Sequence, residues 1–67
     1  MVSMKQVIGF WGINYQEVAN FLGYKSSSTI EKRVKNNDWK IHEVAAILQE
    51  VEKTTGVKID MALLKMD

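Results

Sequence analysis

The chain has 67 residues, of which 46% are apolar and 25% charged, and it contains one histidine and no cysteine or proline. This length corresponds to one domain, residues 1–67, and the composition excludes a disordered chain. Without cysteine the chain forms neither a disulfide nor a thiolate metal site, and one histidine is too few for a zinc site built on imidazoles. We therefore expect no metal and no cofactor.

The net charge of +1 is unevenly distributed along the chain. Residues 24–40 carry five basic and two acidic side chains, a net charge of +3, whereas residues 41–67 carry three basic and five acidic ones. Two interpretations of the basic segment remain open, a solvated face and a surface that binds phosphates. No apolar run is long enough to span a membrane, and the N-terminus does not resemble a signal peptide, so we expect a cytoplasmic protein.

The first predicted helix covers roughly residues 3–11. Its apolar residues Met4, Val7, Ile8 and Trp11 follow the i, i+3, i+4, i+7 spacing of one helix face. Gly12 suits the end of this helix, because glycine readily adopts the left-handed conformation of a C-terminal cap.

The second predicted helix begins after Asn14 and ends at Gly23. Asn14 is a candidate N-cap, and Glu17 stands three residues on, where a capping-box side chain reaches back. The apolar face of this helix consists of Tyr15, Val18, Ala19 and Leu22.

The third predicted helix follows a polar turn over residues 24–29. Any of its three serines can cap the helix: Ser28 would form a capping box with Glu31, whereas Ser26 or Ser27 would shorten the turn. Ile30 and Val34 are the apolar anchors of this helix, and the asparagines of residues 36–38 favour its end there.

The fourth predicted helix begins after Asp38, a candidate cap, and ends at residues 54–56. Its apolar face consists of Ile41, Val44, Ala45, Leu48 and Val51, with Ile47 beside it. This arc is wide, more than about 150° at 100° per residue, and indicates contact with more than one neighbour. A last short helix is expected over about 60–66, capped by Asp60, so the sequence predicts an all-α fold of about five short helices.

The segment Gln16–Gly23, followed by a polar turn and Ile30, is the most specific pattern in the chain. Two short helices joined by a tight turn with a glycine are typical of a helix-turn-helix, here over about 14–37. The small side chain of Ala19 allows the two helices to cross closely. Gly56-Val57-Lys58-Ile59-Asp60, followed by apolar residues, precedes the last predicted helix.

With these features the chain resembles the phage Cro and lambda-repressor family of helix-turn-helix DNA-binding proteins, over roughly residues 3–66. The resemblance implies a compact five-helix bundle that binds a palindromic double-stranded DNA operator as a homodimer and regulates transcription, often as a repressor, in a phage or mobile element. In the family the branched residue of the third helix usually stands six positions after the turn glycine, where this chain has Thr29. Either the turn is one residue longer here, or Thr29 packs inward with Ile30 beside it.

The resemblance places the start of the third helix at the major groove of DNA. The residues expected at base edges are Ser27, Ser28, Thr29 and Lys32. The residues expected at phosphates are Asn14, Gln16, Lys25, Arg33, Lys35 and Lys40. An alternative interpretation of the serines is that they only cap the helix.

The aliphatic C-terminal region is a candidate dimer interface, because family members commonly dimerise there. The residues expected in it are Ile59, Leu63, Leu64 and Met66. The alternative is that these side chains cover the core of their own subunit. The aromatic residues expected in the core are Phe10, Trp11, Phe21 and Trp39.

No set of nucleophile, base and orienting residue is visible, so we expect neither an enzyme nor a small-molecule substrate. His42 and Glu43 are interpreted as a pair on the surface or at a helix start. The alternative function is a protein-interaction module on the same helical fold, such as an anti-repressor or an antitoxin-like partner.

Overall fold

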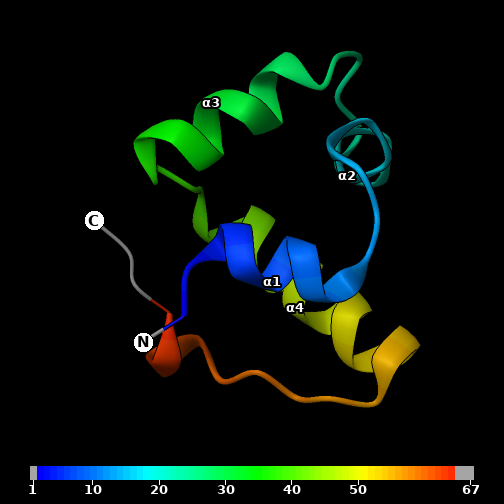
Figure 1. Ribbon diagram of the computed structural model, residues 1–67, viewed down its shortest axis with the longest axis vertical. Helices are drawn as coiled ribbons and strands as arrows, with labels where there is room; N and C mark the ends of the chain where they lie inside the picture. The colour runs from blue at the N-terminus through cyan, green and yellow to red at the C-terminus, as the bar shows by residue number, and fades with distance from the viewer. Residues whose placement is uncertain (1, 65–67) are drawn as a thin grey trace.

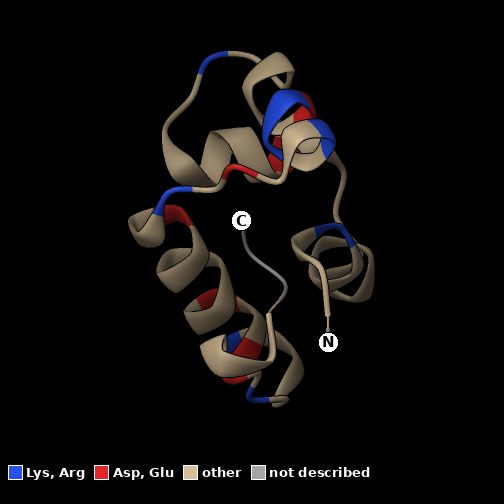
Figure 2. Ribbon diagram, turned by 90° about the vertical axis from the view of Figure 1, so that its left-hand side faces the viewer, with Lys and Arg blue, Asp and Glu red and all other residues tan. Residues whose placement is uncertain are grey.

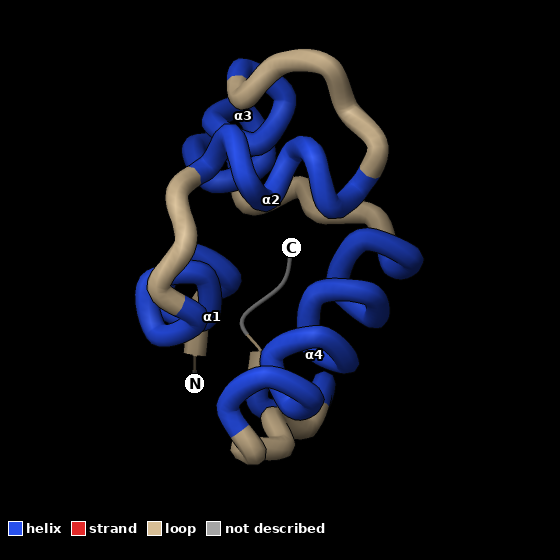
Figure 3. Tube along the Cα trace, turned by 90° about the vertical axis from the view of Figure 1, so that its right-hand side faces the viewer, coloured by secondary structure: helices blue, strands red, loops and turns tan. Residues whose placement is uncertain are grey.

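The computed structural model describes residues 2–64 and confirms the all-α prediction for them (Figure 1). The elements are α1 (Met4–Trp11), α2 (Tyr15–Leu22), α3 (Ser28–Asn36), α4 (Ile41–Thr55) and a 3₁₀ turn, η1 (Met61–Leu63). Figures 1 and 3 show α2 and α3 together at one end of the molecule, with α1 and α4 at the other. Among the described residues, none of the helices has the length and apolar character needed to cross a bilayer.

The ends of α2 match the sequence prediction. The backbone N–H of Glu17 donates to Asn14 Oδ1 over 2.8 Å, and the Asn14 N–H donates to Glu17 Oε1 over 3.2 Å. This reciprocal pair satisfies two of the N–H groups that a helix start leaves without intrahelical partners. At the other end, Gly23 has φ of 87°, in the left-handed region that favours glycine.

Of the alternatives that the sequence left open for the start of α3, the Ser28–Glu31 capping box does not form. Ser27 precedes the helix, but its side chain makes no capping hydrogen bond. The hydroxyl of Ser26 instead accepts from the backbone N–H of Ser28 over 3.2 Å. The helix ends at Asn37, whose φ of 52° is the left-handed conformation expected of an asparagine there.

The start and the buried face of α4 differ from the prediction. Lys40, not Asp38, precedes the helix, and the Glu43 carboxylate accepts the Lys40 N–H over 2.8 Å. The buried residues of α4 are Glu43, Val44, Ile47, Leu48 and Val51. The expected core residues Ile41 and Ala45 are exposed, and they lie just beyond the Leu48 edge of the buried arc, which extends on its other side to Glu43.

The prediction of five helices is wrong for residues 2–64, which contain four α-helices and η1. Asp60 does begin the last element, since its Oδ1 accepts the Ala62 N–H over 2.9 Å. The chain then becomes extended at Leu64, next to Val2, whose N–H donates to the Leu63 carbonyl over 2.9 Å. An extended residue that pairs with Val2 cannot continue a helix. Within the described residues, the helix expected over 60–66 is therefore limited to η1.

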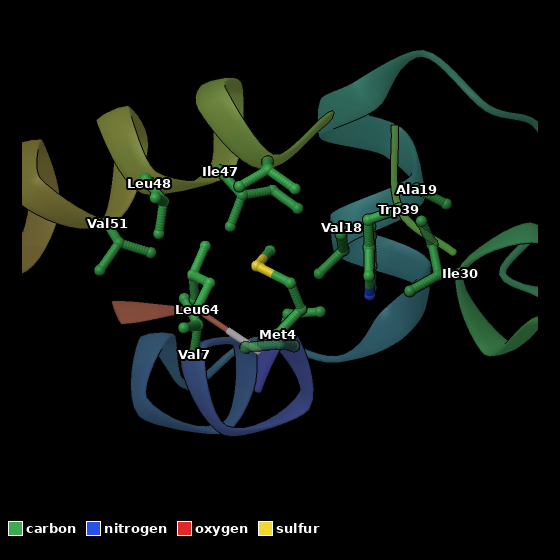
Figure 4. Packing of buried hydrophobic residues seen from close by; sticks show 12 residues of the cluster. Met4, Val7, Val18, Ala19, Ile30, Trp39, Ile47, Leu48, Val51 and Leu64 are labelled. Carbon is green, nitrogen blue, oxygen red and sulfur yellow. The ribbon is translucent and has the colours of Figure 1, made fainter. Parts of the chain in front are cut away.

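The core is one apolar cluster that α1, α2, α3, α4 and the chain ends share (Figure 4). Figure 4 shows Ile30 and Trp39 at one end of it, Leu64 and Val51 at the other, and Met4 between them. The prediction of core aromatic residues holds for Trp39, which is 6% exposed. It is wrong for two others, listed with their exposed fractions: Phe10 at 53% and Phe21 at 42%. Each of these two residues directly precedes the last apolar residue of its helix face and so lies beside that face. The rings of Phe21 and the partly buried Trp11 form a T-shaped pair with centroids 5.5 Å apart.

Candidate nucleic-acid interface

The helices α2 and α3 pack against each other through small and branched apolar side chains. After Gly23 reverses the chain, the Tyr24 N–H donates to the Ala19 carbonyl over 2.8 Å and closes the end of α2. Ala19 and Ile30 are both fully buried, and Figure 4 shows them beside Trp39. The close approach of the two helices therefore depends on an alanine in α2 and one branched residue in α3.

The rotation of α3 decides between the two alternatives that the sequence left open. Ile30 is 0% exposed, whereas Thr29 is half-buried, so Ile30 is the inward position of α3. With 3.6 residues per turn, each residue rotates by about 100° around the helix axis. Every other side chain of α3 can be placed relative to Ile30 on this basis.

The side of α3 opposite Ile30 is polar and cationic. Ser28, Lys32 and Lys35 stand about 160°, 200° and 140° from Ile30, so they share an arc of about 60°. All three are exposed, and we call this set the outer face of α3. Of the residues expected at base edges, Ser28 and Lys32 lie on the outer face, whereas Ser27 and Thr29 are half-buried and lie outside it.

Further lysines lie in the loops that flank α3. Figure 2 shows cationic positions on α3, on the loop that precedes it and on the loop that leads to α4. Lys25 and Lys40 belong to these loops, and both are exposed. Asn14 and Gln16, at the start of α2, are also exposed, although the Asn14 side chain caps its helix and Gln16 Nε2 donates to Asn20 Oδ1 over 3.0 Å.

Arg33 does not lie on the outer face. Its Nε donates to Glu43 Oε1 over 3.0 Å, and the exposed fractions of the two side chains are 20% and 0%. Arg33 is therefore engaged in an internal ion pair between α3 and α4. Its position argues against the phosphate contact that the sequence led us to expect for this residue.

The Glu43 carboxylate is the centre of a polar cluster inside the molecule. The Tyr24 hydroxyl donates to Glu43 Oε2, and the Lys40 N–H and the Arg33 guanidinium donate to Oε1. Burial raises the pKa of Glu43, but the hydrogen bonds from Tyr24, Lys40 and Arg33 more than offset it and hold that pKa below its ordinary value. The hydrogen bond to Glu43 raises the pKa of Tyr24 and that of Arg33. The negative charge of the buried Glu43 carboxylate is thus stabilised by the hydrogen-bond donors of Tyr24, Arg33 and Lys40.

This cluster was not predicted from the sequence, because Glu43 was interpreted as one of a pair with His42 on the surface or at a helix start. The structure leaves His42 exposed and buries Glu43 completely. One local signal was present: Glu43 stands four residues before Ile47 and eight before Val51, on one helix face. Its partners Tyr24 and Arg33 carry no comparable signal in the sequence.

The residues expected in a dimer interface fall into different environments. Leu64 is 4% exposed and packs in the core of its own chain, which is the alternative that the sequence left open. Ile59 is half-buried, and Leu63 is 54% exposed. Met66 lies outside the described residues. Val57 and Met61 are also exposed, so apolar side chains remain at the surface of this region.

Residues 2–64 enclose no pocket, and no group of three metal-ligating side chains occurs among them. In comparisons with known proteins, no family model, no curated protein and no solved structure matches the chain.

Proposed function

We propose that the chain is a helix-turn-helix protein that binds double-stranded DNA as a homodimer and regulates transcription in a phage or another mobile element. The observation that carries this proposal is the outer face of α3, on which Ser28, Lys32 and Lys35 lie opposite the buried Ile30. Insertion of α3 into the major groove would direct this face at base edges and phosphates. Two subunits would occupy grooves about 34 Å apart and block a promoter sterically.

The roles of the lysines follow from their places around α3. Lys32, near the centre of the outer face, suits the O6 and N7 acceptors of guanine, and the short side chain of Ser28 permits close approach to the bases. Lys25, Lys35 and Lys40 suit phosphates. Three phosphate contacts give log K against log salt a slope of about −2.7 for one subunit and about −5.4 for a dimer.

The decisive experiment is selection of binding sites from a random duplex pool at two salt concentrations. We expect a palindromic consensus whose binding weakens steeply with salt. A palindrome reports two-fold symmetry of the bound protein, so the same experiment tests the homodimer. Failure to enrich any sequence at the lower salt concentration would refute the proposed function.

Replacement of Lys32 and of Lys35 by alanine separates base recognition from phosphate contact. Lys32→Ala is expected to cost about 1–3 kcal/mol on the selected duplex and to relax specificity at one position. Lys35→Ala is expected to weaken all duplexes similarly and to reduce the salt slope by about 0.9 per subunit. Both are measured by fluorescence anisotropy with selected and random duplexes.

A matched control is Lys58→Ala, which removes the same charge from an exposed position in the loop between α4 and η1. This variant should bind both duplexes as the unaltered chain does. Unchanged discrimination in Lys32→Ala would contradict the assignment of Lys32 to a base edge.

The competing function is a protein-interaction module, and the exposure of Phe10 and Phe21 favours it. Contiguous patches of exposed apolar side chains mark sites that bind other proteins. Such a module would enrich no DNA sequence, and replacement of Phe10 by serine, rather than of Lys32 by alanine, would abolish its partner binding.

A further inference from the structure

The Glu43 carboxylate accepts hydrogen bonds from three separate segments of the chain. Its partners are the Tyr24 hydroxyl in the turn before α3, the Arg33 guanidinium on α3 and the Lys40 N–H before α4. Glu43 itself is 0% exposed, so water does not compete for these bonds. Among residues 2–64 no buried side-chain polar atom lacks a hydrogen-bond partner, which makes this a fully satisfied cluster.

The apolar packing of α3 leaves its rotation weakly defined. Ile30 is the fully buried residue of this helix, whereas Thr29 and Val34 are half-buried. One buried anchor fixes the position of a helix better than its rotation about its own axis. Arg33 follows Ile30 by three residues, about 60° around the axis and about 4.5 Å along it. The bond from Arg33 to Glu43 therefore supplies the second fixed point that a defined rotation requires.

We infer that Glu43 is a positioning residue that fixes the rotation of α3 and so directs Ser28, Lys32 and Lys35 outward while it keeps Arg33 inward. The consequence for DNA rests on the proposed function, whereas the rotation of α3 is a property of the free chain. Glu43 touches no base or phosphate in this arrangement. Its loss is expected to reduce sequence discrimination through Arg33 and Tyr24.

The rotation can be measured without DNA. The chain has no native cysteine, so Gln49→Cys, at an exposed position on α4, accepts a single nitroxide label. Paramagnetic relaxation of the amide protons along α3 then reports which side of the helix faces the label. We expect a clear helical periodicity in the parent chain and a flattened pattern in Glu43→Gln. Glu52→Gln, which removes one exposed carboxylate from α4, should keep the parent pattern.

A second variant covers the case in which Glu43→Gln does not fold. In the double variant Arg33→Gln, Glu43→Gln both charges are removed, so no buried charge is left without a partner. The shorter glutamine at position 33 does not reach position 43 as arginine does. We expect this variant to fold and to show the same flattened pattern along α3. The parent periodicity in a folded Glu43→Gln or in the folded double variant would overturn the inference.

The DNA measurement compares a selected duplex with a random one at a temperature where each variant is folded. In Glu43→Gln we expect the affinity ratio to fall roughly 5–150-fold, the range for one lost base contact, with the affinity for random duplex unchanged. Simple loss of folded protein would instead lower both affinities in proportion. A flattened pattern with an unchanged ratio would overturn the link to recognition. If the parent chain selects no duplex, the proposed function fails, while a flattened pattern in the variant still supports the positioning of α3.

Discussion

Replacement of Ile30 by alanine tests the rotation of α3 directly, because Ile30 is the fully buried residue of that helix. Truncation of a buried isoleucine to alanine costs about 2–5 kcal/mol through lost burial and the cavity that remains. The whole chain is expected to have a stability of about 3–10 kcal/mol, at about 0.05–0.15 kcal/mol per residue. Ile30→Ala therefore removes a large share of the stability and lowers Tm by about 4–8 °C for each kcal/mol lost.

The matched control is Thr29→Ala, which alters the position that the alternative rotation would bury. Thr29 is half-buried here, and alanine is the better helix former by up to about 0.7 kcal/mol, so we expect a change within about 0.5 kcal/mol of zero. Urea unfolding followed by far-ultraviolet circular dichroism measures both variants. A loss in Thr29→Ala as large as that in Ile30→Ala would refute the rotation and shift the outer face by about 100°.

Two further predictions concern acid and the glycines. The pKa of Glu43 is below its ordinary value in the folded chain, so its stabilisation is complete above the unfolded-state value of about 4.3 and is lost as the pH falls through the lower folded-state pKa. Acid titration of unfolding free energy should therefore show a steeper loss in the parent chain than in Glu43→Gln, and equal profiles would contradict this. Gly23→Ala should destabilise the chain by about 1–2 kcal/mol, because φ at this position is 87°. Gly9→Ala should stabilise it by up to about 1 kcal/mol, because Gly9 lies inside α1 with open space at its Cβ, and thermal unfolding that ranks these two variants in the opposite order would refute both assignments.

The parts of the fold that the sequence predicts are those with local causes. Asn14 and Glu17 are three residues apart, and the hydrogen bonds that start α2 join only these two residues. Gly23 and Asn37 likewise end α2 and α3 through their own backbone conformations. A pattern of four to eight residues is sufficient for such features, because the interacting groups lie within one helical turn.

The parts that the sequence does not predict depend on partners far along the chain. The burial of Glu43 requires Tyr24, 19 residues earlier, and Arg33, 10 residues earlier. A carboxylate in a helix normally indicates the solvent-exposed side. The residues around position 43 do not indicate that the side chains of Tyr24 and Arg33 supply the hydrogen bonds that stabilise its burial. The same reason applies to the short η1, which ends where the chain pairs with Val2.

The Arg33–Glu43 pair also changes the charge available for DNA. Residues 24–40 have a net charge of +3, but the charge of Arg33 is compensated by a carboxylate from outside this segment. Its exposed cations are then Lys25, Lys32, Lys35 and Lys40. At about 0.9 per neutralised phosphate, the three of these that suit phosphates, Lys25, Lys35 and Lys40, give one subunit a salt slope of about −2.7. A single subunit with so few cations binds DNA weakly. Under the proposed function, tight binding therefore requires two subunits, each of which places the outer face of its α3 on one half of a symmetric site.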